Sequence, residues 1–376
     1  MTQQTTQPAH DVNLLYTDVE DSLRDTVRDL LTARCTPDKV VAVYDGGRSL
    51  QPQLWRALTV DLGLAGLLVP EDRGGAGATA REAALVLEEL GRFVAPVPFL
   101  TSSVLATAAV LATDDDDLLA AVAAGDGTAA LVVPLSMSAM SFAAAVRATD
   151  GRLQGRVTSV AGALEADLLL VPVATDGGVE LHAVDAASAT VEPVVSLDMT
   201  RRLADVDLTG AASTIIAPAG RGDAAVREAL TVGAALLASE QLGVAQWCLD
   251  STLAYLKDRR QFGRVVGGFQ ALKHRLADLY VSVESARAAA RYAAATAADH
   301  DPDREVAASL AQAYCADVAV RAAEECVQLH GGIGMTWEHP AHLYLKRAKA
   351  DQIALGTPGA HRRRLSELVD LPAVPA

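Results

Sequence analysis

The chain has 376 residues and a formal net charge of −15, with 32 Lys and Arg against 47 Asp and Glu. Apolar residues make up 51% and charged residues 21%, a balance typical of a globular enzyme and unlike that of a disordered or fibrous chain. The acidic balance excludes nucleic-acid binding through a general cationic surface, because such binding has to neutralise phosphates.

Cysteine usage and the N-terminus give a first indication of the compartment. Cys35, Cys248, Cys315 and Cys326 are widely spaced and form no C-x-x-C pair, so neither a disulfide framework nor a zinc site is predicted. Residues 1–10 lack the features of a signal peptide and are predicted to be disordered. No apolar run approaches the roughly 20 residues that span a bilayer. We therefore expect a cytoplasmic protein with no membrane partner.

Residues 11–125 have a helical pattern and form the first predicted domain. Helices are predicted over 11–34, 53–62, 79–90 and 101–112. Thr36-Pro37 is expected to end the first helix, because proline disfavours helical geometry in the preceding residue. Gly91 is expected to cap the third, since glycine readily adopts the left-handed conformation. The acidic run 114–117 is interpreted as a solvated connector.

Residues 126–220 have a different pattern, in which short Val- and Leu-rich runs alternate with turn residues. Strands are predicted over 129–133, 152–160, 167–173 and 179–184. The turn sequences Asp150-Gly151 and Asp176-Gly177-Gly178 are typical of hairpins. This segment is predicted to be a small antiparallel β domain.

Residues 221–376 are helical again. Apolar residues recur at spacings of three and four over 242–256, 272–290 and 310–327, and Asp301-Pro302 separates the last two runs. Long helices with such apolar stripes bury them against one another in a bundle. The predicted fold class is therefore mainly α with a small middle β domain: an N-terminal helical domain, an antiparallel β domain and a C-terminal helical bundle.

The first candidate site is the run Arg259-Arg260-Gln261-Phe262-Gly263, followed by Gly267-Gly268-Phe269-Gln270, between two predicted helices. A guanidinium can hold a phosphate through two parallel hydrogen bonds, and a glutamine amide can hold the edge of a heterocycle. Glycines let backbone N–H groups approach a ligand. On these residues alone, a surface loop whose glycines only turn the chain is the alternative.

The second candidate site is the segment that begins at Gln328 and contains Gly331, Gly332 and Gly334. No strand precedes it, so it is not a dinucleotide-binding fingerprint of the Rossmann type. One glycine would suffice to end a helix, and three in four residues favour close approach of the backbone to a flat or anionic ligand. His330 is interpreted as a capping or packed side chain, and Trp337 as a core residue.

Together these segments resemble the flavin-dependent acyl-CoA dehydrogenase family. The resemblance covers nearly the whole chain and rests on motifs in the family's order: LWRALTVDLGLAGLLVPEDRGGAG from Leu54, LEELGRFVAPVPFL from Leu87, YLKDRRQFGRVVGGFQALKHRLADLYV over 255–281 and QLHGGIGMTWEHPAHLYLKRAKA over 328–350. It implies a C-terminal four-helix bundle that, with the other two domains, encloses FAD and an acyl-CoA thioester.

The resemblance also implies which residues contact the cofactor and which partners are needed. It implies that an arginine and a glutamine contact the FAD of a neighbouring subunit. The chain would therefore assemble as a homodimer, as a tetramer or as a pair with a homologous subunit. An electron-transferring flavoprotein is the acceptor expected for the family. The implied cofactor-binding residues are Arg259, Gln261, Phe262, Gln270, Gln328, Gly331, Gly332 and Thr357.

The sequence departs from the family at the catalytic base, which removes the α-proton during α,β-desaturation. The usual glutamate of a Tyr-Glu-Gly-Thr segment corresponds to Leu355, and the alternative glutamate on the helix leading into LGVAQ corresponds to Gly233. Neither residue accepts a proton. Glu240 lies two helical turns from Gly233 and is a candidate for a relocated base. A structural or solvated carboxylate is the alternative.

A second departure lies in the middle domain. The family's flavin-facing Thr-Glu-Pro corresponds to Val-Val-Pro at 132–134, and its Trp-containing segment to Val-Thr-Ser-Val at 157–160. This subunit is therefore expected to hold its own flavin poorly.

Three hypotheses follow. The first is the base-lacking subunit of a heteromeric dehydrogenase acting on a bulky thioester, such as a steroid-derived one. The second is a self-sufficient homo-oligomer with a relocated base, and the third is a non-catalytic paralogue that binds FAD or acyl-CoA.

Overall fold

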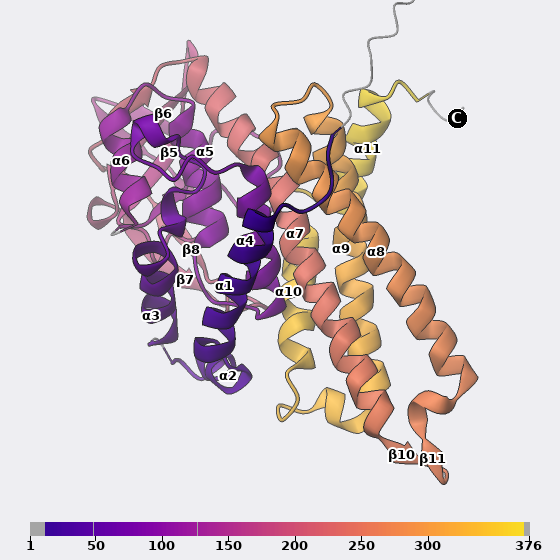
Figure 1. Cartoon of the computed structure of the whole chain (residues 1–376). Helices are drawn as coiled ribbons and strands as arrows, with labels where there is room; N and C mark the ends of the chain where they lie inside the picture. The colour runs from indigo at the N-terminus through magenta and orange to yellow at the C-terminus, as the bar shows by residue number, and fades with distance from the viewer. Residues whose placement is uncertain (1–11, 48, 126, 372–376) are drawn as a thin grey trace, which may run out of the picture.

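The computed structural model describes residues 12–371 except 48 and 126, and Figure 1 shows their arrangement. The predicted disordered segment 1–10 lies outside the described residues. Helices of the first third and the strands that follow form one half of the molecule, and long C-terminal helices form the other half (Figure 1). In the part of the chain that the structure describes, no helix combines the length and apolarity needed to cross a bilayer.

The first third is helical, as predicted, but has more helices than expected. Pro37, which was expected to end a helix, begins the next one, because proline at the first helical position lacks an N–H group that would be unpaired there anyway. The elements are α1 (Asp18–Arg34), α2 (Pro37–Tyr44), α3 (Leu50–Arg56), η1 (Ala57–Asp61), η2 (Leu64–Gly66), η3 (Glu71–Arg73), α4 (Ala80–Arg92), η4 (Phe99–Ala106), α5 (Thr107–Leu111) and α6 (Asp116–Ala124).

Capping side chains account for two differences from the prediction, the later start of α1 and the helix that follows the acidic run. Helix α1 begins at Asp18 instead of residue 11, since Thr17 and Glu20 exchange capping hydrogen bonds of 2.7 and 3.2 Å. The acidic run 114–117 is not a simple connector. Asp115 accepts a hydrogen bond of 2.9 Å from the Leu118 N–H and caps α6, where acidic side chains favour the positive end of the helix.

Gly91 does not cap α4, contrary to expectation, but lies inside the helix where α4 packs against α7 (Arg221–Asp258). A Cβ atom at Gly91 would lie 2.1 Å from the carbonyl oxygen of Glu240, and one at Gly243 would lie 1.9 Å from that of Glu88. Both distances are far below van der Waals contact. The two glycines therefore allow the backbones of α4 and α7 to approach directly.

The middle third contains two sheets and is mixed, not wholly antiparallel. In the six-stranded sheet β1 and β2 pair in parallel with β5, whereas its other pairings and those of the three-stranded sheet β4-β8-β7 are antiparallel. The strands are β1 (Ala129–Leu131), β2 (Val146–Thr149), β3 (Arg152–Gln154), β4 (Arg156–Ala161), β5 (Leu168–Thr175), β6 (Gly178–Asp185), β7 (Thr190–Val194), β8 (Leu203–Asp207) and β9 (Thr214–Ala217).

The predicted strand 152–160 is divided between the two sheets. Gly155 has a φ of 145°, a backbone conformation that L side chains rarely adopt, and it separates β3 from β4. The chain thus leaves one sheet and enters the other at a glycine corner.

The last third is a helical bundle around α7, as predicted, and the break at Asp301-Pro302 separates α8 from α9. Alanine fills much of its interior, while Leu253 and Leu310, expected in the apolar stripes, are 38% and 40% exposed. The remaining elements are β10 (Arg260–Gln261), β11 (Arg264–Val265), η6 (Val266–Gly268), α8 (Gln270–Ala298), α9 (Arg304–His330), η7 (Gly331–Met335), α10 (Ala341–Ile353) and α11 (Pro358–Leu368).

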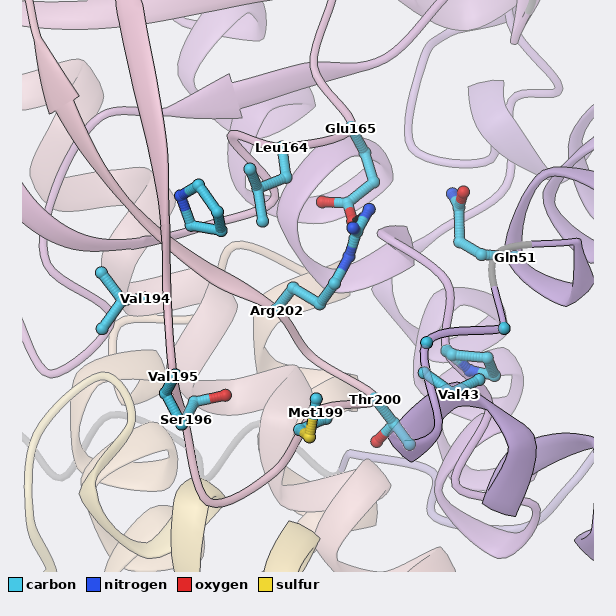
Figure 2. Close-up of a pocket in the computed structure, with 14 residues that line it drawn as sticks. Val43, Gln51, Leu164, Glu165, Val194, Val195, Ser196, Met199, Thr200 and Arg202 are labelled. Carbon is cyan, nitrogen blue, oxygen red and sulfur yellow. Dashed lines mark hydrogen bonds and ion pairs between the residues drawn. The ribbon is translucent and has the colours of Figure 1, made fainter.

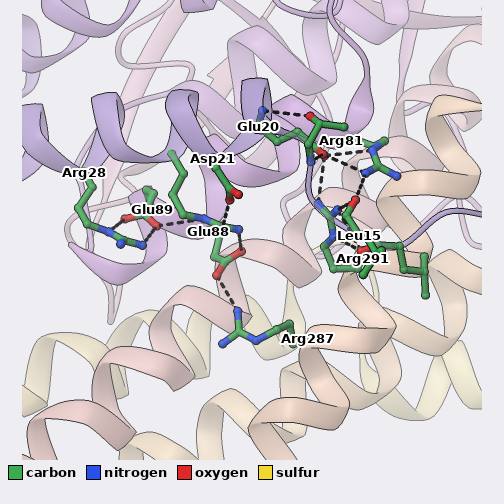
Figure 3. A network of polar contacts seen from close by, with 12 residues as sticks. Leu15, Glu20, Asp21, Arg28, Arg81, Glu88, Glu89, Arg287 and Arg291 are labelled. Atoms are coloured by element: carbon green, nitrogen blue, oxygen red, sulfur yellow. Dashed lines mark hydrogen bonds and ion pairs between the residues drawn. The ribbon is translucent and has the colours of Figure 1, made fainter.

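Buried ion pairs fasten the N-terminal helices to the bundle (Figure 3). Glu20, which is 1% exposed, accepts hydrogen bonds of 3.0 Å from Arg81 on α4 and 3.2 Å from Arg291 on α8. Burial alone would raise the pKa of Glu20, but the bonds from Arg81 and the Thr17 N–H and the charge of Arg291 bring it down to about 2.

We predict that Glu20 makes stability depend on pH below about 5. Its pKa is lower in the folded than in the unfolded chain, so its contribution is complete above the unfolded pKa of about 4.5 and is lost as the pH falls toward 2. That contribution is about 2–3 kcal/mol. Glu20→Gln keeps a side-chain oxygen that can accept the bond from the Thr17 N–H group but removes the charge. The difference in urea unfolding free energy between wild type and variant should therefore shrink from pH 6 to pH 3. A constant difference would contradict this account.

We also predict that Gly91→Ala destabilises the fold by about 1–3 kcal/mol or more, because its methyl group forces α4 and α7 apart. Gly268→Ala is the matched control, since a Cβ there meets no atom within 4 Å. Chemical unfolding of both variants measures the difference. Equal stabilities would show that the helices tolerate wider separation.

Candidate functional site

The first candidate site is an exposed hairpin at one end of the bundle, where β10 and β11 join α7 to α8 (Figure 1). Arg259, Arg260 and Gln261 are exposed, and within the described residues their side chains form no hydrogen bond or ion pair. Phe262 is 90% exposed and has a φ of 53°. The phenylalanine ring and the unpaired guanidinium groups of this hairpin are therefore accessible to another molecule.

The second candidate site lies at the same end of the bundle. His330 is packed, as predicted, and its ring stacks on Tyr255 with 4.5 Å between centroids. Tyr255 lies one turn before Arg259, so this stacking joins the end of α9 to the end of α7. Gln328, Gly331 and Gly332 are exposed, and a Cβ atom at either glycine would meet nothing within 4 Å. Packing within the chain therefore does not explain Gly332.

Two side chains of this region differ from the prediction. Trp337 is 61% exposed and is not a core residue, because the loop after η7 runs along the surface. Its ring contacts Tyr44, and the Lys346 ammonium lies 4.2 Å from both ring centroids. Met335 is 82% exposed beside it. The loop thus adds apolar surface to the hairpin end.

Thr357 is separated from these residues. It caps α11 through a 3.3 Å hydrogen bond from the Ala360 N–H, and the carbonyl of nearby Ala354 bonds Gln312 on α9 at 3.0 Å. The distance from Gln312 to His330 along α9 is about 27 Å, at a rise of 1.5 Å per residue. The predicted cofactor contacts therefore fall into two groups: Thr357, and the residues at the hairpin end.

The two positions of the expected base lie side by side, although they are far apart in the sequence. A Cβ atom on Gly233 would lie 3.1 Å from Cδ1 of Leu355 and 2.3 Å from Cδ2 of Leu105, a residue of η4. Leu355 and Leu105 are 1% and 4% exposed. Two leucine side chains therefore fill the place where a carboxylate would be expected, and Leu105 is a residue that the sequence did not single out.

A cavity of about 690 Å³ lies close to this place and includes Gly356 and Thr357 in its wall. Its charged side chains are Arg227, Arg363 and Arg364 with Glu305 and Glu367. Most of the polar lining is therefore contributed by α7, α9 and α11, and the cavity offers more positive than negative charge.

Glu240 is fully buried and is engaged by two guanidinium groups. Arg201 reaches both of its oxygens at 2.6 Å, and Arg347 contacts one of them. Burial alone would raise the pKa of Glu240, but Arg201 and Arg347 hold it below its usual value. A carboxylate that is so engaged is a poor proton acceptor, and this geometry favours the structural alternative for Glu240.

The ion pairs of Glu240 belong to a larger cluster that joins three parts of the chain. Arg347 on α10 donates to Asp198 at 2.5 Å and to Thr200 at 2.6 Å, and Arg201 also contacts Asp351. Burial raises the pKa of Asp351 to about 7, although Arg201 opposes this. The cluster therefore holds the segment before β8 against α7 and α10.

The structure also tests whether a flavin ring fits beside the middle domain. The Leu135 N–H bonds the Ser159 carbonyl at 2.9 Å, and the Leu135 carbonyl accepts from the Leu355 N–H at 2.7 Å. Pro134 and Val160 form a bridge alongside. The segments expected to face the ring are thus bonded to each other, and the N–H and carbonyl groups of Leu135 are both occupied. The Val-Val-Pro run at 132–134 also offers no side-chain hydrogen bond. These residues therefore fit the polar edge of a flavin ring poorly, whereas the unpaired donors of the hairpin end fit the polar parts of FAD.

Comparisons with known proteins show the family of the chain. The models "Acyl-CoA dehydrogenase, N-terminal domain" and "Acyl-CoA dehydrogenase, C-terminal domain" match residues 17–116 and 220–369. Acyl-CoA dehydrogenase IpdE2 of Mycolicibacterium smegmatis is 37% identical over 343 residues, covering 91% of this chain and 96% of that protein.

Two solved structures are also similar. One is the ChsE4-ChsE5 complex from Mycobacterium tuberculosis, with a TM-score of 0.84 and 28% identity over 96% of this chain and 100% of that chain. The other is described as a Tcur3481-Tcur3483 steroid ACAD, with a TM-score of 0.82 and 29% identity over 94% and 98% of the two chains.

We predict that Glu240→Gln destabilises the fold by about 3–5 kcal/mol, because it leaves the buried guanidinium groups of Arg201 and Arg347 without their carboxylate. Glu228→Gln is the control, since the Arg304–Glu228 pair is about one third exposed and such pairs contribute about 0–1 kcal/mol. Unfolding in urea measures both. Unchanged stability with a specific loss of turnover would instead support a catalytic role for Glu240.

Proposed function

The chain belongs to the acyl-CoA dehydrogenase family, and we propose that it is the base-lacking subunit of a heteromeric, FAD-dependent acyl-CoA dehydrogenase. The observation that carries this proposal is the meeting of Leu105, Leu355 and Gly233 at the place of the base. None of these positions offers a group that can take a proton. Glu240, two turns farther along α7, is held by two guanidinium groups.

The residues of the hairpin end have the chemistry to hold part of a dinucleotide. Arg259 would pair with a phosphate through its guanidinium, and the amides of Gln270 and Gln328 would hold hydrogen-bonding edges. Gly331 and Gly332 leave their backbone free to approach a flat ligand, because no atom of this chain fills the space above them. When bound, FAD supplies the acceptor for the hydride that leaves the β-carbon of the thioester.

The missing base has a kinetic consequence that a second subunit would remove. Removal of a general base typically costs 10²–10⁴-fold in rate, or roughly 3–5 kcal/mol of barrier. A homologous subunit that keeps its glutamate would supply that group in its own active site, while this chain would contribute Arg259 and Gln328 across the boundary. The exposed Phe262, Met335 and Trp337 support a covered interface at that end.

The proposed substrate is a bulky acyl-CoA thioester, such as a steroid-derived one. The similarity to a structure described as a steroid ACAD supports this class. An interface between unlike subunits also has precedent in the ChsE4-ChsE5 complex, which this chain resembles over nearly its whole length. An electron-transferring flavoprotein in the cytoplasm is the proposed electron acceptor.

A non-catalytic paralogue is the second candidate, favoured by the backbone bonds that occupy the N–H and carbonyl groups of Leu135 at the expected flavin position. This candidate and the heteromeric enzyme differ in one respect. Only the heteromeric enzyme gains acyl-CoA-dependent flavin reduction when the chain is combined with a homologue.

We predict that the chain purified alone carries far less than one FAD per subunit and does not oxidise acyl-CoA, whereas the complex with a glutamate-containing homologue does both. In that complex Arg259→Gln should weaken FAD binding at least tenfold, because a charge-assisted bond to phosphate is lost. Lys257→Gln removes a neighbouring exposed charge and should leave binding within twofold. Flavin absorbance and dye-coupled oxidation provide the measurements.

Full activity of the lone chain, with one flavin per subunit, would contradict the accessory role. A complex that forms but shows no flavin reduction in an anaerobic acyl-CoA titration would favour the non-catalytic paralogue.

A further inference from the structure

A second cavity of about 280 Å³ lies between the N-terminal helices and the middle domain (Figure 2). Its wall is formed by the turn between α2 and α3, the loop between β4 and β5, and the segment between β7 and β8. It has no lining residue in common with the cavity beside Leu355 and none with the hairpin end. The dehydrogenase function proposed above does not use it.

The apolar part of the wall is aliphatic. Val43, Leu164, Val194 and Met199 contribute side chains, together with two prolines, and the lining contains no aromatic ring. A flat aromatic ligand would therefore find no ring to stack on. An apolar cavity of about 150 Å³ accepts one benzene-sized ring, so this volume corresponds to about two fused rings. The volume and the aliphatic wall together favour a compact, saturated ring system.

The polar part of the wall is the ion pair between Glu165 and Arg202, in which one polar atom of each side chain takes no part. Glu165 accepts from Nε and Nη2 of Arg202 at 2.9 and 2.5 Å through a single oxygen, Oε1. The second oxygen of Glu165 and Nη1 of Arg202 take no part in this pair. A hydroxyl group can donate to the carboxylate and accept from the guanidinium, whereas a ligand carboxylate would be repelled by Glu165 and an ammonium by Arg202. The pair therefore favours a neutral hydroxyl.

One part of the wall is held in place before any ligand arrives. Met199 and Thr200 lie between Asp198 and Arg201, and both of these belong to the buried ion cluster with Arg347 and Glu240. A segment fixed in this way loses little conformational freedom on binding, which favours affinity.

We propose that this cavity is a binding site for a small alicyclic alcohol, with two fused saturated rings against the aliphatic wall and a hydroxyl group at the Glu165–Arg202 pair. The proposal is independent of the dehydrogenase function, because it concerns binding at a separate cavity and requires no cofactor.

The test uses the full-length chain and three soluble probes, with affinities from calorimetry or ligand-observed NMR. 2-Decalol has the proposed rings and hydroxyl, 2-naphthol is its flat aromatic counterpart, and decalin-2-carboxylate carries a charge in place of the hydroxyl. We expect saturable binding of 2-decalol, with the other two at least fivefold weaker.

Two variants at neighbouring positions, Val194 at the end of β7 and Leu197 in the segment that follows, locate the site. Val194 lines the cavity and is 36% exposed, whereas Leu197 is 59% exposed and does not line it. Val194→Trp should fill the cavity and weaken 2-decalol binding at least tenfold, and Leu197→Trp should change it less than twofold. Both residues are partly exposed, so both variants are expected to fold, and circular dichroism checks this.

Binding of 2-naphthol or the carboxylate as tightly as 2-decalol would overturn the proposed ligand class. Equal affinity in both variants would overturn the location. Absence of saturable binding by 2-decalol would overturn the proposal itself.

Discussion

The arrangement of this molecule depends on charges buried where three parts of the chain meet. Glu240 on α7, Arg347 on α10 and Arg201 before β8 are each almost wholly removed from water. Isolated charges in such surroundings would be costly, so each guanidinium needs its carboxylates and each carboxylate its guanidinium. Because no two of these groups come from the same segment, the cluster is satisfied only when the middle domain and the bundle are docked correctly.

The same requirement separates structural acid groups from catalytic ones in this chain. The acid that lies on the right helix is committed to the cluster, and the place of the expected base is lined by leucine side chains. The other end of the bundle differs in this respect. There the side chains of Arg259 and Gln261 form no hydrogen bond or ion pair within the described residues, and glycine leaves open space above the backbone.

Much of this could be predicted from the sequence, and the failures have physical causes. Periodic apolar residues and proline breaks located the long helices, and the motifs around Arg259 and Gly331 identified the family that the comparisons confirm. Gly91 and the run 114–117 were misinterpreted, because a glycine or an acidic residue has the same appearance in a sequence whether it ends a helix, starts one or allows close packing.

The role of Glu240 could not be read from local pattern either, since its partners Arg201 and Arg347 lie 39 and 107 residues away. The sequence does not single out Leu105 either, because an apolar residue in an apolar run gives no indication of which residue it contacts in the folded chain. The prediction of Trp337 as a core residue is wrong, and only the three-dimensional path of its loop shows that it is exposed.

The backbone bonds of Leu135 have a mechanical consequence. Its N–H group bonds the Ser159 carbonyl and its carbonyl bonds the Leu355 N–H group, so one residue ties β4 to the segment before α11. The place of the expected base is therefore fixed by backbone bonds to the middle domain as well as by the leucine side chains that fill it.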